Sequence, residues 1–152
     1  MTGVTITLDD REAWAMLKRL QDRLDRTKPA FQVIGEIVRS SVERNFAAEG
    51  RPRKWDPSAR AIAEGGQTLS DTGRLRRSLN TQTGEGYAAV GTNVIYAAIH
   101  HFGGEIRPKK AKALNTPYGL SRKATMPARP FLMVQDEDLD EINAAISDFL
   151  SG

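Results

Sequence analysis

The sequence contains no cysteine, which excludes disulfide bonds, thiolate metal sites and cysteine nucleophiles. Its two histidines, His100 and His101, are adjacent, so on one helix they would point about 100° apart and could not easily share a zinc ion. No apolar run reaches the ~20 residues that cross a bilayer, and the first residues lack the pattern of a secretion signal. These absences predict a soluble protein with no metal and no membrane partner, made and retained in a cytoplasm.

Recognised catalytic signatures are also absent, because the sequence has no glycine-rich phosphate loop, no GxSxG elbow and no HExxH helix. The carboxylates of Asp136, Glu137 and Asp138 are conceivable acid–base groups. They begin a helical pattern, however, where negative charge complements the helix dipole or meets arginines of another chain. A small hydrolase that uses His100 with a carboxylate has the weakest support, because no nucleophile is visible. The sequence therefore predicts neither an enzyme nor a cofactor.

Charge is strongly segregated along the 152 residues, although the net charge is only +3. Residues 51–80 carry seven basic and three acidic side chains, and residues 101–130 carry seven and one. Residues 131–152 carry six acidic side chains and no basic one. The basic segments could bind nucleic acid, an acidic segment could meet a basic loop of a neighbouring subunit, or both could be solvated surface. The length fits a single domain over residues 1–152.

Apolar spacing predicts the elements of the first third of the chain. Residues 4–8 alternate apolar and polar side chains, which predicts a half-buried strand. Two helices should follow, one after Asp9 or Asp10 and one from Pro29 that ends before Gly50. We expect both apolar stripes to face a core and the two helices to form an antiparallel hairpin. The stripes consist of Ala13, Leu17, Leu20 and Leu24 in the first helix and Phe31, Ile34, Val38, Val42 and Phe46 in the second.

Glycine and proline residues divide the rest of the chain, after residue 47, into loops and short elements. Residues 47–66 and 107–128 are predicted to be long, mobile, basic loops, with a small hairpin at the base of the second loop anchored by Ile106 and Leu114. Between these loops the patterns predict a short helix over 70–79 and a β-hairpin of strands 80–83 and 87–91. A helix over 95–102 should follow and end at Gly103 and Gly104. After the second loop we expect a terminal helix, with one apolar face formed by Leu139, Ile142, Ile146, Phe149 and Leu150. The fold class is therefore α+β, with helices packed on a small antiparallel sheet.

Four groups of residues, in this order, carry a resemblance to a known family. They are residues 53–57 around Trp55, residues 69–79, residues 90–93 with 96–104, and residues 126–132. Their order and spacing over residues 31–150 resemble the phage virion morphogenesis family, the tail-completion proteins of Mu-like phages and prophages. The chain departs from the family pattern in its short stretch at 57–60 and at His101, where relatives often carry glutamine.

The resemblance implies a non-enzymatic structural protein that acts in tail completion or head–tail joining at the neck. It implies a homo-oligomer, plausibly a ring, that contacts other phage tail or neck proteins, in the virion and, during assembly, in the host cytoplasm. The alternative is a nucleic-acid-binding module that contacts DNA non-specifically through the basic loops. Candidate partner or oligomer contacts are Trp55, Arg74, Arg76, Arg77, His100, Phe102, Arg129, Phe131, Asp136, Glu137 and Asp138.

Overall fold

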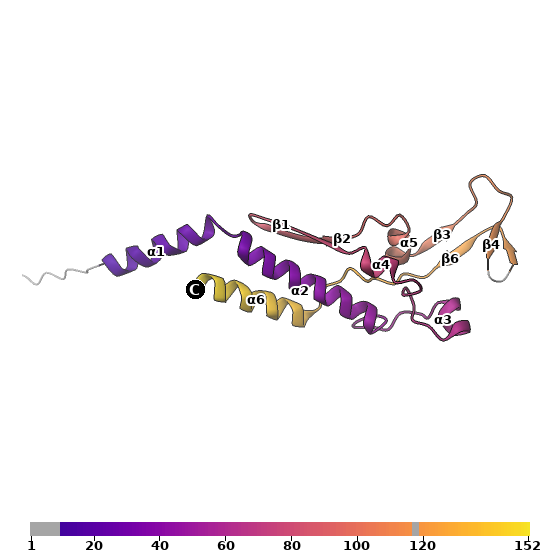
Figure 1. Cartoon of the computed structure of the whole chain (residues 1–152), viewed down its shortest axis with the longest axis horizontal. Coiled ribbons are helices and arrows are strands. Elements are labelled where there is room, and N and C mark those ends of the chain that lie inside the picture. The colour runs from indigo at the N-terminus through magenta and orange to yellow at the C-terminus, as the bar shows by residue number, and fades with distance from the viewer. Residues whose placement is uncertain (1–9, 117–118) are drawn as a thin grey trace, which may run out of the picture.

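A computed structural model describes residues 10–116 and 119–152 of the chain. These residues form an elongated α+β structure of six helices and three separate two-stranded antiparallel sheets (Figure 1). The strand predicted over 4–8 lies outside the described residues. The helices are α1 (Arg11–Leu24), α2 (Lys28–Ala47), α3 (Ala59–Glu64), α4 (Arg74–Arg77), α5 (Ala97–Phe102) and α6 (Asp136–Ser151). No described helix is both long and apolar enough to cross a membrane.

The long helix α2 is the centre of the fold. Pro29 occupies its first turn, where a missing backbone N–H costs no hydrogen bond. The predicted apolar stripe is confirmed, because Ile34, Val42 and Phe46 are buried. This helix packs against α6 and against the hairpin of β1 (Asn80–Gly84) and β2 (Tyr87–Gly91), which was also predicted.

Close packing of the hairpin on α2 depends on a glycine in the helix. A Cβ atom at Gly35 would lie 2.8 Å from Cγ2 of Thr81 and 3.1 Å from Cγ2 of Thr83. A larger residue would therefore push the β1–β2 sheet away from α2. This contact could not be predicted from sequence, because one glycine within a helical pattern does not show which residues approach it.

The hydrophobic core lies where the C-terminal half of α2 meets the segments on either side of α4 and α5. Phe46 is fully buried, with ring centroids 5.3 Å from Phe131 and 5.9 Å from Trp55. Leu75, Leu79 and Ala97 complete one side of this cluster, with Val42 beneath it. The core thus joins residues that are more than 80 positions apart in sequence.

The prediction for the first helix is wrong in two respects. No residue of α1 is buried, so its apolar stripe does not face a core of this chain. The helix also does not fold back along α2; Figure 1 shows it projecting beyond the start of α2. Its tertiary contacts are with the end of α6, where an Arg23 Nη atom donates to the carbonyl of Leu150. A short turn permits an antiparallel hairpin but does not require one, and here the hairpin β1–β2 and α6 already cover α2.

The segment 47–66 is more ordered than predicted. It contains α3, which Ser58 caps by accepting a hydrogen bond from the Ala61 amide at 3.1 Å and which ends at Gly65 in a left-handed conformation. Its first part is fixed by the Trp55 amide, which donates to the Glu49 carbonyl at 2.7 Å. The Arg51–Pro52 peptide bond is cis. Ser58 and Gly65, which flank α3, can be recognised in the sequence as residues typical of helix ends. The six residues of α3 are too few to show helical periodicity.

The segment 107–128 was predicted as a loop with a small hairpin at its base; a hairpin is present at the base, and a second one lies farther along the segment. Strand β3 (Gly104–Ile106) pairs with β6 (Ala124–Met126), and β4 (Leu114–Thr116) pairs with β5 (Gly119–Ser121) within the same excursion. The predicted anchor pair is wrong, because Ile106 lies opposite Ala124 and Leu114 lies opposite Ser121. Strands of three residues are too short for an alternating pattern to reveal them.

Candidate functional site

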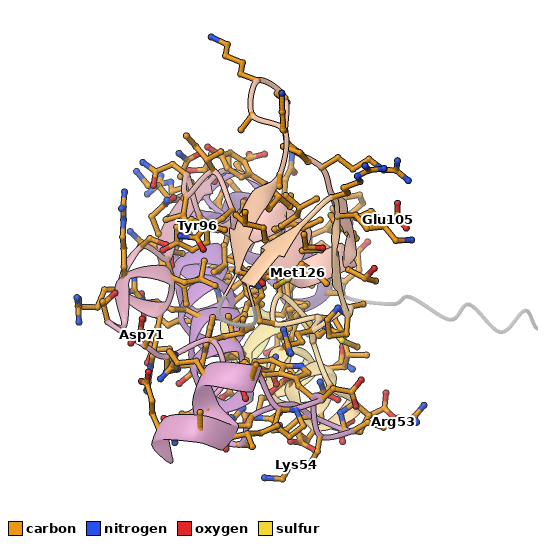
Figure 2. The ribbon with its side chains drawn as sticks, turned by 90° about the vertical axis from the view of Figure 1, so that its right-hand side faces the viewer. Arg53, Lys54, Asp71, Tyr96, Glu105 and Met126 are labelled. Carbon is orange, nitrogen blue, oxygen red and sulfur yellow. The ribbon has the colours of Figure 1, made fainter. Side chains whose placement is uncertain are left out.

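Three of the predicted interface residues line one cavity. Arg74 of α4, His100 of α5 and Arg129 border a cavity of about 340 Å³, together with Tyr96 and Met126. Figure 2 views the molecule from this end, with Tyr96, Asp71 and Met126 labelled on the face toward the viewer. We call this cavity the arginine pocket. It is bordered by residues from four separate parts of the chain, which are residues 58–60, 69–75, 96–100 and 126–129.

The backbone around Arg129 is held in place by α5. Gly103 ends α5 with φ of +71°, and a Cβ atom there would lie 2.7 Å from the amide nitrogen of Ala128. Only glycine allows this approach in this conformation. The amide of Arg129 then donates to the carbonyl of His100 at 2.8 Å. The glycine motif after α5 therefore positions the arginine of the last sequence motif.

The guanidinium of Arg129 is in an uncommon environment for a cation. The residue is only 4% exposed, and its Nε atom donates to the backbone carbonyl of Asp56 at 2.7 Å. Burial lowers the pKa of Arg129, and the charge of the Asp56 side chain partly opposes this effect. Within the described residues no carboxylate lies within ion-pair distance of Arg129.

His100 forms the neutral wall of the arginine pocket. Burial lowers its pKa, and the charge of Arg129 lowers it further, so the imidazole is neutral near pH 7. Its Nδ1 atom is buried without a hydrogen-bond partner in the described chain, and the Tyr96 ring packs against it edge-on, with centroids 5.8 Å apart. Within the described residues, Asp71 is the one carboxylate that lines the same cavity as His100.

Two predicted interface residues lie in the core. Phe131 is fully buried, and Trp55 is 7% exposed and donates through Nε1 to the carbonyl of Pro130 at 3.2 Å. Phe102, in contrast, is 76% exposed and packs beside His101 with ring centroids 4.6 Å apart. The interface prediction therefore depends on the exposed residues among the predicted contacts, whereas Trp55 and Phe131 are part of the core.

The predicted acidic interface is divided by the structure. Asp138 is fully buried, accepts hydrogen bonds from Ser41 and from the amide of Gln135, and pairs with Arg44 at 2.6 Å. Glu137 pairs with Arg51 at 2.9 Å. The sequence left open whether the acidic and basic groups pair within one subunit, and for these two carboxylates they do. Asp136 is exposed and has no partner among the described residues.

The other arginines of α4 are not among the residues that line the cavity. Arg77 is exposed, with an Nη atom near Gly73, and Arg76 is half-buried. Sequence reasoning missed Tyr96 and Met126 as cavity residues, because they belong to motifs whose apolar members looked like scaffold. In the described residues, no three histidine, aspartate or glutamate side chains are grouped so that they could hold a metal ion.

Comparison with known proteins identifies the family. The sequence profile of the phage virion morphogenesis family matches residues 8–151, nearly the whole chain. The chain belongs to the phage virion morphogenesis family. The match spans all four motif regions, and residues from three of them border the arginine pocket.

Two curated relatives are similar over most of their length. The chain is 33% identical over 139 residues to Mu-like prophage FluMu G protein 2 of Haemophilus influenzae, with 91% of this chain and 89% of the relative covered. It is 31% identical over 147 residues to the putative capsid assembly protein G of Escherichia phage Mu, with 86% and 87% covered. No solved structure matches the chain significantly. As a family member, the chain has a role in phage virion assembly.

Proposed function

We propose that this member of the virion morphogenesis family acts in tail completion or head–tail joining at the neck, as a homo-oligomer that works by binding rather than by turnover. A ring matches the symmetry of a tail, and head-to-tail contacts close into a ring when their rotation allows it. Its partners are then other copies of itself and neighbouring tail or neck proteins in the virion. The uncovered apolar face of α1 is the observation that carries this proposal.

The apolar face of α1 has no partner within the described chain. Leu17 is 55% exposed, Leu24 is 61% exposed and Trp14 is 65% exposed, all on a helix without a buried residue. Monomeric soluble proteins rarely leave a continuous apolar patch of this kind open to water, and such patches mark interaction sites. A second subunit that covers α1 would bury these side chains together.

The separation of basic and acidic side chains on each subunit supports specific association between subunits rather than aggregation. The basic hairpin excursion of β3–β6 lies at one end of the molecule, whereas the acidic helix α6 lies nearer the other end, beside α2 (Figure 1). Opposite charges at separate places on one subunit favour a defined orientation between neighbouring copies and raise the rate of encounter.

A charge placed in the apolar face of α1 should break the oligomer. We expect Leu17→Asp to weaken self-association at least ~30-fold, because burying an unpaired carboxylate in an apolar contact costs more than about 2 kcal/mol. The measurement is the solution mass by light scattering over a range of protein and salt concentrations, without nucleic acid. A discrete higher oligomer of the parent chain that dissociates in the variant supports the proposal.

The matched control is Ala15→Asp. Ala15 is exposed and lies on the opposite side of α1 from the apolar stripe, so this variant adds the same charge to the same helix outside the proposed contact. We expect its mass distribution to equal that of the parent chain. A parent chain that stays monomeric at every concentration contradicts self-assembly, and equal losses in both variants would point to helix disruption instead.

The burial of Trp55 is one argument against the alternative of a nucleic-acid-binding module. Binding of single strands usually combines cations with exposed aromatic rings on which bases stack. Trp55, which follows Lys54 in the first basic segment, is buried in the core and cannot serve as such a ring. A gel shift at low salt is the direct check, since phosphate contacts weaken steeply as salt rises.

A further inference from the structure

The arginine pocket contains a buried cation with unused hydrogen-bond donors. A guanidinium carries five N–H donors, and Arg129 uses only Nε, toward the carbonyl of Asp56. Within the described residues its Nη atoms have no hydrogen-bond partner. Arg129 is only 4% exposed and its Nη atoms are not enclosed by protein, so these free donors open to the cavity and offer an anion a partly desolvated site.

Other residues around the pocket restrict what the anion can be. Arg60 and Arg74 also line the pocket, whereas Asp71 is the one carboxylate in its lining and its side chain is 68% exposed. Much of the remaining lining is apolar, from Leu69, Leu75, Tyr96 and Met126. A lone inorganic ion would leave these apolar groups uncovered. The lining therefore fits a carboxylate carried next to an apolar side chain.

This chain carries such a combination on α6. Leu139 is 51% exposed, and it lies between Asp136, one turn before it, and Asp140, the next residue. Both aspartates are exposed and have no partner among the described residues, unlike Asp138. We call Asp136, Leu139 and Asp140 the acidic knob. Its two carboxylates and one leucine match the arginines and the apolar lining of the pocket.

The acidic knob does not fill the pocket of its own molecule: within the described residues, neither Asp136 nor Asp140 forms an ion pair with an arginine of the pocket. The knob is the first turn of α6, which packs against α2 and ends beside α1 (Figure 1). The pocket lies at the α4–α5 end of the molecule, on the face that Figure 2 shows. The two surfaces are therefore available to different neighbours.

We propose that the arginine pocket is a receptor for the acidic knob of a second copy of this chain. The contact is heterologous, with the pocket of one subunit on α6 of the next, and it leaves one free pocket and one free knob on every pair. Repetition of such a contact builds a ring or an open chain. The proposal rests on the self-assembly of the proposed function and names the surfaces that would carry it.

Four chains test this contact by sedimentation velocity. The pocket variant is Arg74→Gln, which removes an exposed cation of the pocket. The knob variant carries Asp136→Asn and Asp140→Asn in one chain. The controls are the parent chain and Arg53→Gln. Arg53 is an exposed cation on the same view but away from the pocket (Figure 2). We expect the pocket and knob variants each to self-associate at least ~10-fold more weakly than the parent, and Arg53→Gln to associate equally.

Mixing the two defective variants gives a result that a merely structural role would not produce. One intact pocket and one intact knob are then present on different subunits, so the mixture should associate about tenfold more tightly than either variant alone. Arg129→Gln should behave like Arg74→Gln, with its thermal unfolding measured because Arg129 is buried. Arg74→Gln keeps the test valid if Arg129→Gln does not fold.

Every other outcome counts against the contact. An oligomeric parent whose pocket and knob variants remain oligomeric overturns the contact and leaves the proposed self-assembly standing. A parent that is monomeric throughout overturns both. If Arg74→Gln leaves self-association unchanged but abolishes a low-salt gel shift with DNA, the pocket binds phosphate instead and the contact is wrong.

Discussion

Phe131→Ala should destabilise the fold by about 4 kcal/mol, the usual cost of truncating a fully enclosed phenylalanine. The ring of Phe131 has no exposed surface and packs against Phe46, with His101 on another side at a centroid distance of 5.2 Å. Truncation leaves a cavity among side chains from α2 and α5 that cannot all move inward. The measurement is the free energy of unfolding in urea at one fixed protein concentration, since self-association would add to apparent stability.

The control for this prediction is Phe102→Ala. It makes the same chemical change in a neighbouring motif at a side chain that is 76% exposed, and we expect it to change the free energy of unfolding by less than about 0.5 kcal/mol. Equal effects at the two positions would contradict the central place of Phe131 in the core. A loss of self-association in Phe102→Ala without a loss of stability would instead place Phe102 in an interface.

Asp138→Asn should cost about 3 kcal/mol, because it removes the charge from a buried carboxylate that several donors share. Ser41, the Gln135 amide and Arg44 all contact this one side chain, which joins α6 to α2. Asp138 and Gln135 also form a capping box at the start of α6. The substitution therefore weakens both the helix start and its attachment to α2.

Stability should depend on pH through the same carboxylate. Burial alone would raise the pKa of Asp138, but hydrogen bonds from Ser41 and Gln135, together with Arg44 and Arg51, hold this pKa below its ordinary value. A carboxyl group whose pKa is lower in the folded state stabilises the fold above its unfolded pKa of about 3.9, and the contribution is lost as pH falls through the folded pKa.

Unfolding measured from pH 7 to pH 2 checks the sign of this effect. The difference between the parent and Asp138→Asn should be largest near pH 7 and should shrink as the pH falls below about 4. Asp136→Asn is the control, because it lies in the same helical turn but is exposed and unpaired among the described residues; at a protein concentration where all three chains are monomeric, its effect should stay below about 0.5 kcal/mol. A difference that grows toward low pH would contradict the assigned role of Asp138.

Periodic patterns in the sequence predicted the regular elements well. The stripe from Ile34 to Phe46 gave α2, the turn at Gly86 gave the β1–β2 hairpin, and the apolar positions after Asp136 gave α6. These elements are long enough, or have turns distinct enough, for local spacing to determine them. The short helix α3 and the three-residue strands are too short for apolar spacing to show them, and β3 in addition pairs with β6 about twenty residues later in the chain.

The candidate site could be predicted only in part for the same reason. Arg74, His100 and Arg129 belong to recognisable motifs, but their meeting at one cavity depends on the close approach of Gly103 to Ala128. The run of acidic residues looked uniform in sequence, yet burial sets Asp138 apart from Asp136. Which carboxylate turns inward is decided by Ser41 and Arg44, nearly one hundred residues earlier.

The sparse contacts of α1 link the order of this helix to assembly. An isolated helix of about 12–15 residues is marginal in water, and α1 has 14 residues with little support from the rest of the chain. A neighbour that covers its apolar face would supply the missing tertiary support, so coil-to-helix ordering and subunit docking become one thermodynamic step. The entropy cost of ordering α1 then falls on the docking step, so each contact is weaker than its buried area alone would make it, and helix content should rise together with assembly.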